Sequence, residues 1–162
     1  MAGLRILVTG ATGHIGSVFC PLATARGHAV TALHRRSAFP KWADFDCVVN
    51  LAAAGVKPTG RTWAACLTGN FLFLQSLLNS ILVSGAKPRI VLAQSVREFE
   101  TATNLTKWDD PYTVSKKLGS LFAQDWERQY KGTVWSVVIA PCYQPGEVEA
   151  VAERLLKACH EG

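Results

Sequence analysis

The feature that most constrains the fold is an apolar run near the N-terminus that ends in regularly spaced glycines. The run over residues 6–8 is typical of a buried strand in a parallel sheet. Gly10, Gly13 and Gly16 follow it, and apolar residues at helical spacing begin at Ile15. The sequence therefore predicts a strand, a glycine turn and a helix in direct succession.

This order of strand, turn and helix is the context in which a glycine pattern predicts dinucleotide binding. Gly10 would allow the tight turn, Gly13 would let the backbone approach a pyrophosphate, and Gly16 would let the helix pack closely on the strand. Backbone N–H groups at the start of the helix would face the anion, assisted by the helix dipole. A tight turn that binds no ligand is the alternative interpretation.

The glycine spacing is one residue wider than the usual dinucleotide fingerprint, and residues 9–16 read Thr-Gly-Ala-Thr-Gly-His-Ile-Gly. This segment resembles the extended branch of the short-chain dehydrogenase/reductase superfamily, the branch of NAD-dependent epimerases and dehydratases. The resemblance implies that the contacts to the cofactor come from Thr9, Gly10, Thr12, Gly13, His14, Ile15 and Gly16.

The end of the second predicted strand, residues 29–33, carries the feature that separates the two nicotinamide dinucleotides. An acidic residue there would bond the ribose 2′-hydroxyl of NAD, whereas an arginine accommodates the 2′-phosphate of NADP. This chain has Arg35 and Arg36 and no acid at that place, and a guanidinium pairs well with phosphate. We therefore expect NADP rather than NAD as the cofactor, with a solvated basic loop as the alternative.

The connection between the second and third predicted strands is short. Members of the extended branch that this chain resembles insert a further strand and helix here. Residues 37–44 leave no room for that unit. The third strand, 47–51, runs into a segment similar to the branch's His-x-Ala-Ala motif, with Asn50 in place of the histidine. The resemblance implies that small and apolar residues of this segment lie against the cofactor, namely Leu51, Ala52 and Ala53.

Tyr112 and Lys116 form a Y-x-x-x-K pattern just after helix-start residues at 109–111. Residues four apart lie on one helix face, so the ammonium group approaches the phenol. Such a cation, together with an oxidised nicotinamide ring, favours the phenolate. Tyr112 could then give or take a hydroxyl proton while hydride moves to or from the nicotinamide. By the resemblance, Ser95 supplies the hydroxyl that holds the same substrate oxygen.

The resemblance implies further roles around this pair. Lys116 would also contact the nicotinamide ribose, and Pro141 would lie beside the nicotinamide. Asn70, within a helix predicted over residues 62–84, would help to place the lysine, and a plain packing role is its alternative. The implied catalytic set is Ser95, Tyr112, Lys116 and Asn70.

The chain also departs from the branch in ways that bear on activity. Phe99 and Glu100 replace a tyrosine and a glycine in the loop after Ser95, and Ala140 replaces an arginine. The chain is considerably shorter than extended members, so we expect it to lack their C-terminal substrate subdomain. An inherited but idle site is therefore the alternative to a working one.

Length and composition favour one soluble domain over residues 1–162, since 49% of the residues are hydrophobic and 18% are charged. The alternation of strands and helices predicts an α/β fold with a three-layer, Rossmann-type doubly wound parallel sheet. We expect about five strands in the order 2-1-3-4-5 with right-handed crossovers.

The charge distribution and the cysteine content limit the classes of partner and the cellular location that the sequence predicts. The net charge is +5, but the basic residues are scattered, which argues against nucleic acid. The apolar stretch 71–83 is interrupted by polar residues and looks too short and too polar for a bilayer. The five spaced cysteines, the lack of room for a signal peptide and the absence of metal-ligand spacing predict a cytoplasmic protein without a metal site. The resemblance implies a homodimer through helices 62–84 and 111–130.

Three functions remain open at this stage. The first is an NADP-dependent oxidoreductase or epimerase acting on a hydroxyl or keto group of a small molecule, with a nucleotide sugar as one candidate. The second is a cofactor-binding sensor or subunit without turnover. The third is an isomerase, cyclase or dehydratase on the same fold that causes no net redox change.

Overall fold

The computed structural model describes residues 3–35, 37–99, 110–142 and 144–160. Within these ranges one sheet of five parallel strands has the order β2-β1-β3-β4-β5, which confirms the predicted order. The strands are β1 (Arg5–Thr9), β2 (Ala29–Leu33), β3 (Cys47–Asn50), β4 (Arg89–Ser95) and β5 (Val134–Ile139).

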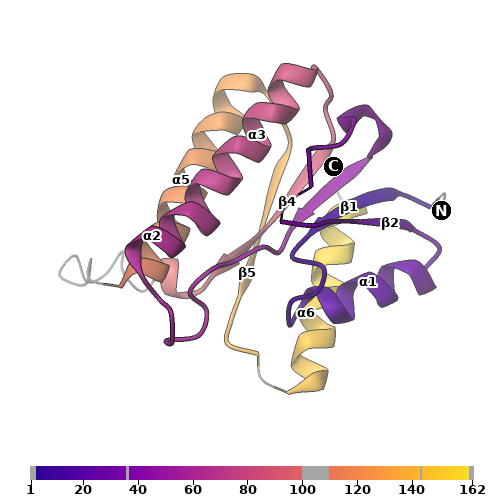
Figure 1. Ribbon diagram of the computed structural model, residues 1–162. Helices are drawn as coiled ribbons and strands as arrows, with labels where there is room; N and C mark the ends of the chain where they lie inside the picture. The colour runs from indigo at the N-terminus through magenta and orange to yellow at the C-terminus, as the bar shows by residue number, and fades with distance from the viewer. Residues whose placement is uncertain (1–2, 36, 100–109, 143, 161–162) are drawn as a thin grey trace.

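Helices cover both faces of the sheet and complete three layers (Figure 1). α1 (Gly16–Ala25) and α6 (Pro145–His160) pack together on one face, and α3 (Phe73–Ser84) and α5 (Pro111–Tyr130) pack together on the other. The predicted Rossmann-type α/β architecture is therefore confirmed. All five strands end toward the same edge of the sheet, and the loops there build the site described below.

The central strand β1 explains why the layers form. Its residues Ile6, Leu7 and Val8 are all fully buried, although side chains alternate between the two faces of a strand. Ile6 and Val8 join the core beneath α1 and α6, and Leu7 joins the core beneath α3 and α5. A strand covered by helices on both sides needs an unbroken apolar run, which is the pattern in the sequence.

The helix predicted over 62–84 is one continuous helical segment, Trp63–Ser84. It consists of α2 (Trp63–Cys66), a π-helical turn (Leu67–Leu72) and α3. By length and composition alone this segment could cross a membrane, so the prediction that the stretch is too short and too polar does not hold for the whole helix. A core helix meets the same criteria, and the inner stripe of α3 is buried against the sheet and α5.

The short connection between β2 and β3 closes the core by itself. Trp42 is 2% exposed, and its indole Nε1 donates a hydrogen bond to Ser80 Oγ of α3 at 2.9 Å. The ring of Phe39 lies 5.5 Å from that of Trp42 and 6.5 Å from that of Phe73. Two aromatic side chains thus fill space at this side of the sheet without a further strand and helix.

We therefore expect Trp42→Ala to lower the free energy of unfolding by about 3–5 kcal/mol, because it empties a buried aromatic site. Trp135→Ala is the matched control, since Trp135 is 36% exposed on the edge strand β5, and it should cost about 1 kcal/mol. Urea unfolding followed by circular dichroism measures both. Equal losses for the two variants would contradict the assigned core.

Candidate active site

A cavity of about 1040 Å³ lies at the carboxyl ends of the strands. Its walls are the glycine turn after β1, the ends of β2, β3 and β4, the first turns of α5 and the segment after β5. In open α/β sheets ligands bind at this edge, where the strand order reverses on either side of β1. The cavity therefore lies where folds of this type bind their ligands.

Most residues that the sequence singled out come together here. The cavity is lined by Thr9, Gly10, Thr12, Gly13, His14, Ile15, Gly16, Arg35, Leu51, Ala52, Ala53, Ser95, Tyr112, Lys116 and Pro141. Asn70 does not line the cavity and is buried behind it. Arg36 lies outside the described residues.

The glycine turn has the geometry of a pyrophosphate cradle. Gly10 has a φ of +69°, and a Cβ on it would lie 2.7 Å from the backbone nitrogen of Ala52. The N–H of Gly13 closes the turn by donating to Gly10 O at 2.9 Å. The N–H groups of His14 and Ile15 have no acceptor among the described residues, so they are available to an anion at the start of α1.

Side chains on both sides of the turn hold it in place. Thr9 Oγ1 donates to Asn50 Oδ1 at 2.5 Å, and the N–H of Ala52 donates to Thr9 Oγ1 at 3.3 Å. The ends of β1 and β3 are therefore tied at the cavity floor. His14 Nε2 donates to Cys142 O at 3.0 Å, because a carbonyl can only accept. This bond joins the glycine turn to the segment after β5, and it engages the imidazole of His14.

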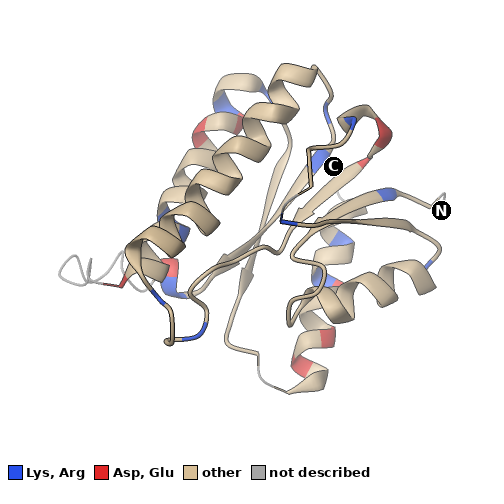
Figure 2. Ribbon diagram, in the orientation of Figure 1, with Lys and Arg blue, Asp and Glu red and all other residues tan. Residues whose placement is uncertain are grey.

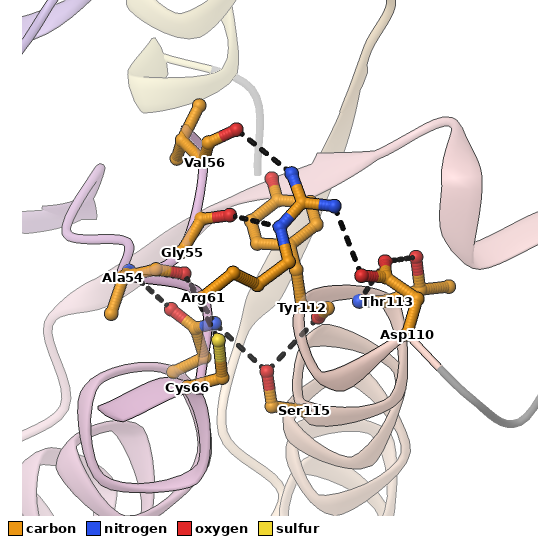
Figure 3. Close-up of polar contacts among 10 residues, drawn as sticks. Ala54, Gly55, Val56, Arg61, Cys66, Asp110, Tyr112, Thr113 and Ser115 are labelled. Atoms are coloured by element: carbon orange, nitrogen blue, oxygen red, sulfur yellow. Dashed lines mark hydrogen bonds and ion pairs between the residues drawn. The ribbon is translucent and has the colours of Figure 1, made fainter. Parts of the chain in front are cut away.

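Asn70 connects two walls of the site from its place in the π-helical turn. Its Oδ1 accepts from the N–H of Ala54 at 2.7 Å, and its Nδ2 donates to Ala54 O at 3.0 Å and to Ser115 Oγ at 2.8 Å. Ser115 Oγ in turn donates to Tyr112 O at 2.9 Å, and Figure 3 shows this chain of contacts. Among the described residues no hydrogen bond joins the side chains of Asn70 and Lys116, and Asn70 is linked to α5 through Ser115.

Arg61 is a site residue that the sequence did not indicate. Its Nε donates to Gly55 O at 2.7 Å, and its Nη2 donates to Val56 O at 3.0 Å. Its Nη1 pairs with Asp110 Oδ1 at 3.0 Å. The guanidinium carbon then lies 5.4 Å from the centroid of the Tyr112 ring (Figure 3), within the range of a cation–π contact.

The sequence marks Asp110 only as a helix-start residue. The structure confirms that role, because its side chain accepts from the N–H of Thr113 at 3.0 Å. Burial opposes ionisation of this carboxyl, but the hydrogen bonds from Thr113 and Arg61 outweigh it and lower the pKa of Asp110. The carboxylate of Asp110 therefore caps α5 and also holds the guanidinium of Arg61 over the ring of Tyr112.

Burial and three neighbouring charges act on the pKa of the Tyr112 phenol. Burial raises the pKa of the Tyr112 phenol, and the charge of Glu98 raises it further. A hydrogen bond with Ser95 and the cations Arg61 and Arg97 lower it, but the balance lies above the ordinary value. Burial therefore favours the protonated phenol against the effect of the cations, and it is an effect that the sequence pattern did not reveal.

Lys116 is held close to the strand that ends in Ser95. Its Nζ donates to Ala93 O at 2.6 Å. Burial lowers the pKa of Lys116, and the charge of Glu98 raises it. The Ala93 carbonyl of β4 thus places the ammonium group of Lys116, and the charge of Glu98 partly offsets the effect of burial on its pKa. Tyr112 lies one turn earlier on the same face of α5.

Comparison with known proteins places these features in a family. The sequence profile of the NAD dependent epimerase/dehydratase family matches residues 6–162. None of the curated proteins matches the chain.

Solved structures give the same fold. The chain is similar to RMD from Pseudomonas aeruginosa complexed with NADPH, at 21% identity and a TM-score of 0.68. It is also similar to WbmF from Bordetella bronchiseptica in complex with NAD+ and UDP (17%, 0.74) and to UDP-glucuronic acid 4-epimerase from Bacillus cereus in complex with NAD (19%, 0.71). The matches cover 88%, 94% and 88% of this chain and 56%, 57% and 57% of the others, respectively.

At such identities the solved structures establish the fold, and the chain spans little more than half of their length. The family match extends over almost all of this chain, including the glycine turn and the Tyr112–Lys116 pair. The protein belongs to the NAD dependent epimerase/dehydratase family.

Proposed function

We propose that this protein is an NADP-dependent enzyme that acts on a hydroxyl or keto group of a small molecule, with Tyr112 as the acid or base. The observation that carries the proposal is the meeting of Ser95, Tyr112 and Lys116 at one cavity with the glycine turn. A tyrosine, a hydroxyl and a cation around one substrate oxygen, next to a dinucleotide cradle, suit the transfer of a proton and a hydride.

The residues present fit a nicotinamide dinucleotide. The cradle at Gly10 leaves no room for a side chain, and the N–H groups of His14 and Ile15 would take the pyrophosphate. Arg35 lines the cavity at the end of β2 and would take a 2′-phosphate, while Lys116 would hold the nicotinamide ribose. When bound, the cofactor supplies or accepts the hydride.

The chain's own residues would handle the proton and the substrate oxygen. The raised pKa of Tyr112 favours its protonated form, and Tyr112 would donate this proton to a carbonyl oxygen that becomes a hydroxyl. Ser95, which hydrogen-bonds with Tyr112, would orient that oxygen. Arg61 covers the Tyr112 ring and would keep water from that side of the phenol.

The charge of the cavity supports an anionic substrate such as a nucleotide sugar. Among the described residues that line it, Arg35, Lys57, Arg61, Arg97 and Lys116 are basic and none is acidic. The first and last have roles with the cofactor, and Arg61 is paired with Asp110, which leaves Lys57 and Arg97. Arg61 and Arg97 both act on the charge of Tyr112, and the loop before α2 is basic (Figure 2). The names of similar proteins include a UDP-sugar epimerase.

We also propose a homodimer through helices 62–84 and 111–130 and a cytoplasmic location. The helices leave Leu72, Val83 and Leu121 exposed, and a shared interface would cover apolar surface of this kind. Sedimentation at micromolar concentration should give a dimer, and a monomer would contradict the proposal.

The cofactor choice is tested by titrating the protein with NADPH and NADH while following energy transfer from its five tryptophans. We expect tighter binding of NADPH. Arg35→Ala, alone and with Arg36→Ala, should weaken NADPH roughly ten- to a hundredfold, because a charge-assisted contact is lost, and leave NADH unchanged. Lys57→Ala is the basic-residue control. Equal affinities in the wild type would contradict the choice of NADP.

Turnover is tested with Tyr112→Phe on a panel of UDP-sugars and their keto forms, following both NADPH absorbance and product formation. The variant should keep the NADPH affinity of the wild type and lose activity by a factor of about 100 to 10,000, because it removes the proton donor. Product without a net change in cofactor would indicate an epimerase that returns the hydride, or another isomerase, a cyclase or a dehydratase. Activity equal to that of the wild type would rule out Tyr112 as the acid or base.

A further inference from the structure

Glu98 is a buried carboxylate beside the active site, and the proposed reaction does not use it. It follows β4 three residues after Ser95 and is 1% exposed. Glutamate is almost never fully buried unless it is paired, because removing its charge from water is costly. A residue of this type at this place therefore needs a physical reason.

Hydrogen bonds of Glu98 join two walls of the site. Its Oε1 accepts from the N–H of Ser95 at 2.6 Å, and its Oε2 accepts from the hydroxyl of Ser120. Ser120 is buried in α5, four residues after Lys116 and eight after Tyr112, so all three lie on one helix face. The carboxylate thus bridges the turn that carries Ser95 and the helix face that carries the other two catalytic candidates.

The charge of Glu98 also reaches both of those side chains. It raises the pKa of Lys116, against the effect of burial, and it raises the pKa of Tyr112 together with burial. The groups that act in the other direction on Tyr112 are Ser95 on β4, Arg97 after it and Arg61 from the loop before α2. Among the described residues, Glu98 is therefore the one acid that shifts the pKa of the phenol.

We propose that Glu98 is a positioning residue of this active site, which holds the Ser95 turn against the Tyr112–Lys116 face of α5 and places a negative charge beside that pair. This charge favours the protonated phenol of Tyr112, and it stabilises the ammonium group of Lys116 against the effect of burial. The inference deepens the proposed function, on which it rests for the identity of the catalytic residues. The contacts themselves do not depend on a bound cofactor.

The charge is tested in the ligand-free protein with Glu98→Gln. The amide keeps an oxygen for the N–H of Ser95, and the Ser120 hydroxyl can turn to accept from the amide nitrogen, so the variant removes the charge and keeps the shape. Ser120→Ala keeps the charge and removes one bond, and Arg61→Gln removes a cation from the same phenol. Titration of ¹³C-labelled tyrosine by NMR, assigned with Tyr112→Phe, reads the Tyr112 phenol directly.

We expect the Tyr112 midpoint to fall in Glu98→Gln, to rise in Arg61→Gln and to stay unchanged in Ser120→Ala. An unchanged midpoint in a folded Glu98→Gln would overturn the electrostatic part of the proposal. If Glu98→Gln fails to fold, the titrations of Ser120→Ala and Arg61→Gln still test the proposal. Ser120→Ala keeps the charge of Glu98, so a lower Tyr112 midpoint in this variant would contradict that charge as the cause of the raised pKa.

The positioning part is tested by hydrogen exchange of the Ser95 amide. Glu98→Gln should keep its protection, whereas Glu98→Ala should exchange about tenfold faster, because the N–H loses its acceptor. Equal protection in Glu98→Ala and the wild type would overturn the bridge. Failure of NADPH to bind would count against the proposed function alone, since none of these measurements involves a cofactor.

Discussion

The structure depends on how closely the backbone of the glycine turn approaches the end of β3. Gly10 adopts a positive φ with its Cα so near Ala52 that a side chain would collide with the backbone. Thr9 and Asn50 fasten the same two strand ends by a hydrogen bond. Because β1 and β3 meet in this way, the start of α1 faces the cavity, and the ends of the remaining strands and α5 complete it.

At the catalytic end of the cavity, burial is the largest influence on the pKa of the Tyr112 phenol. Tyr112 and Lys116 lie one turn apart on α5. Burial and Glu98 outweigh the cations Arg61 and Arg97, so the pKa of the phenol lies above its ordinary value. The Tyr112 phenol of such a site begins as a proton donor, and a positively charged nicotinamide would shift this phenol toward the phenolate.

The local parts of this arrangement were predictable and the long-range parts were not. The apolar run at 6–8, the glycine spacing and the Tyr112–Lys116 pattern are local signals, and the strand order followed from them. Arg61 pairs with Asp110 across 49 positions of the chain, and no periodicity marks such a contact. Glu98 reads as one more polar residue of a loop until the fold shows it buried.

The most direct measurement of the central claim is a ¹⁵N NMR titration of the protein with NADPH, with the backbone amides assigned. If residues 9–16 hold the pyrophosphate and Tyr112 lies at the nicotinamide end, the largest shift changes should fall on His14 and Ile15, with further changes at Ala52, Ser95 and Lys116. Saturable changes confined to other surfaces, or none at millimolar NADPH, would contradict a dinucleotide site built on the glycine turn.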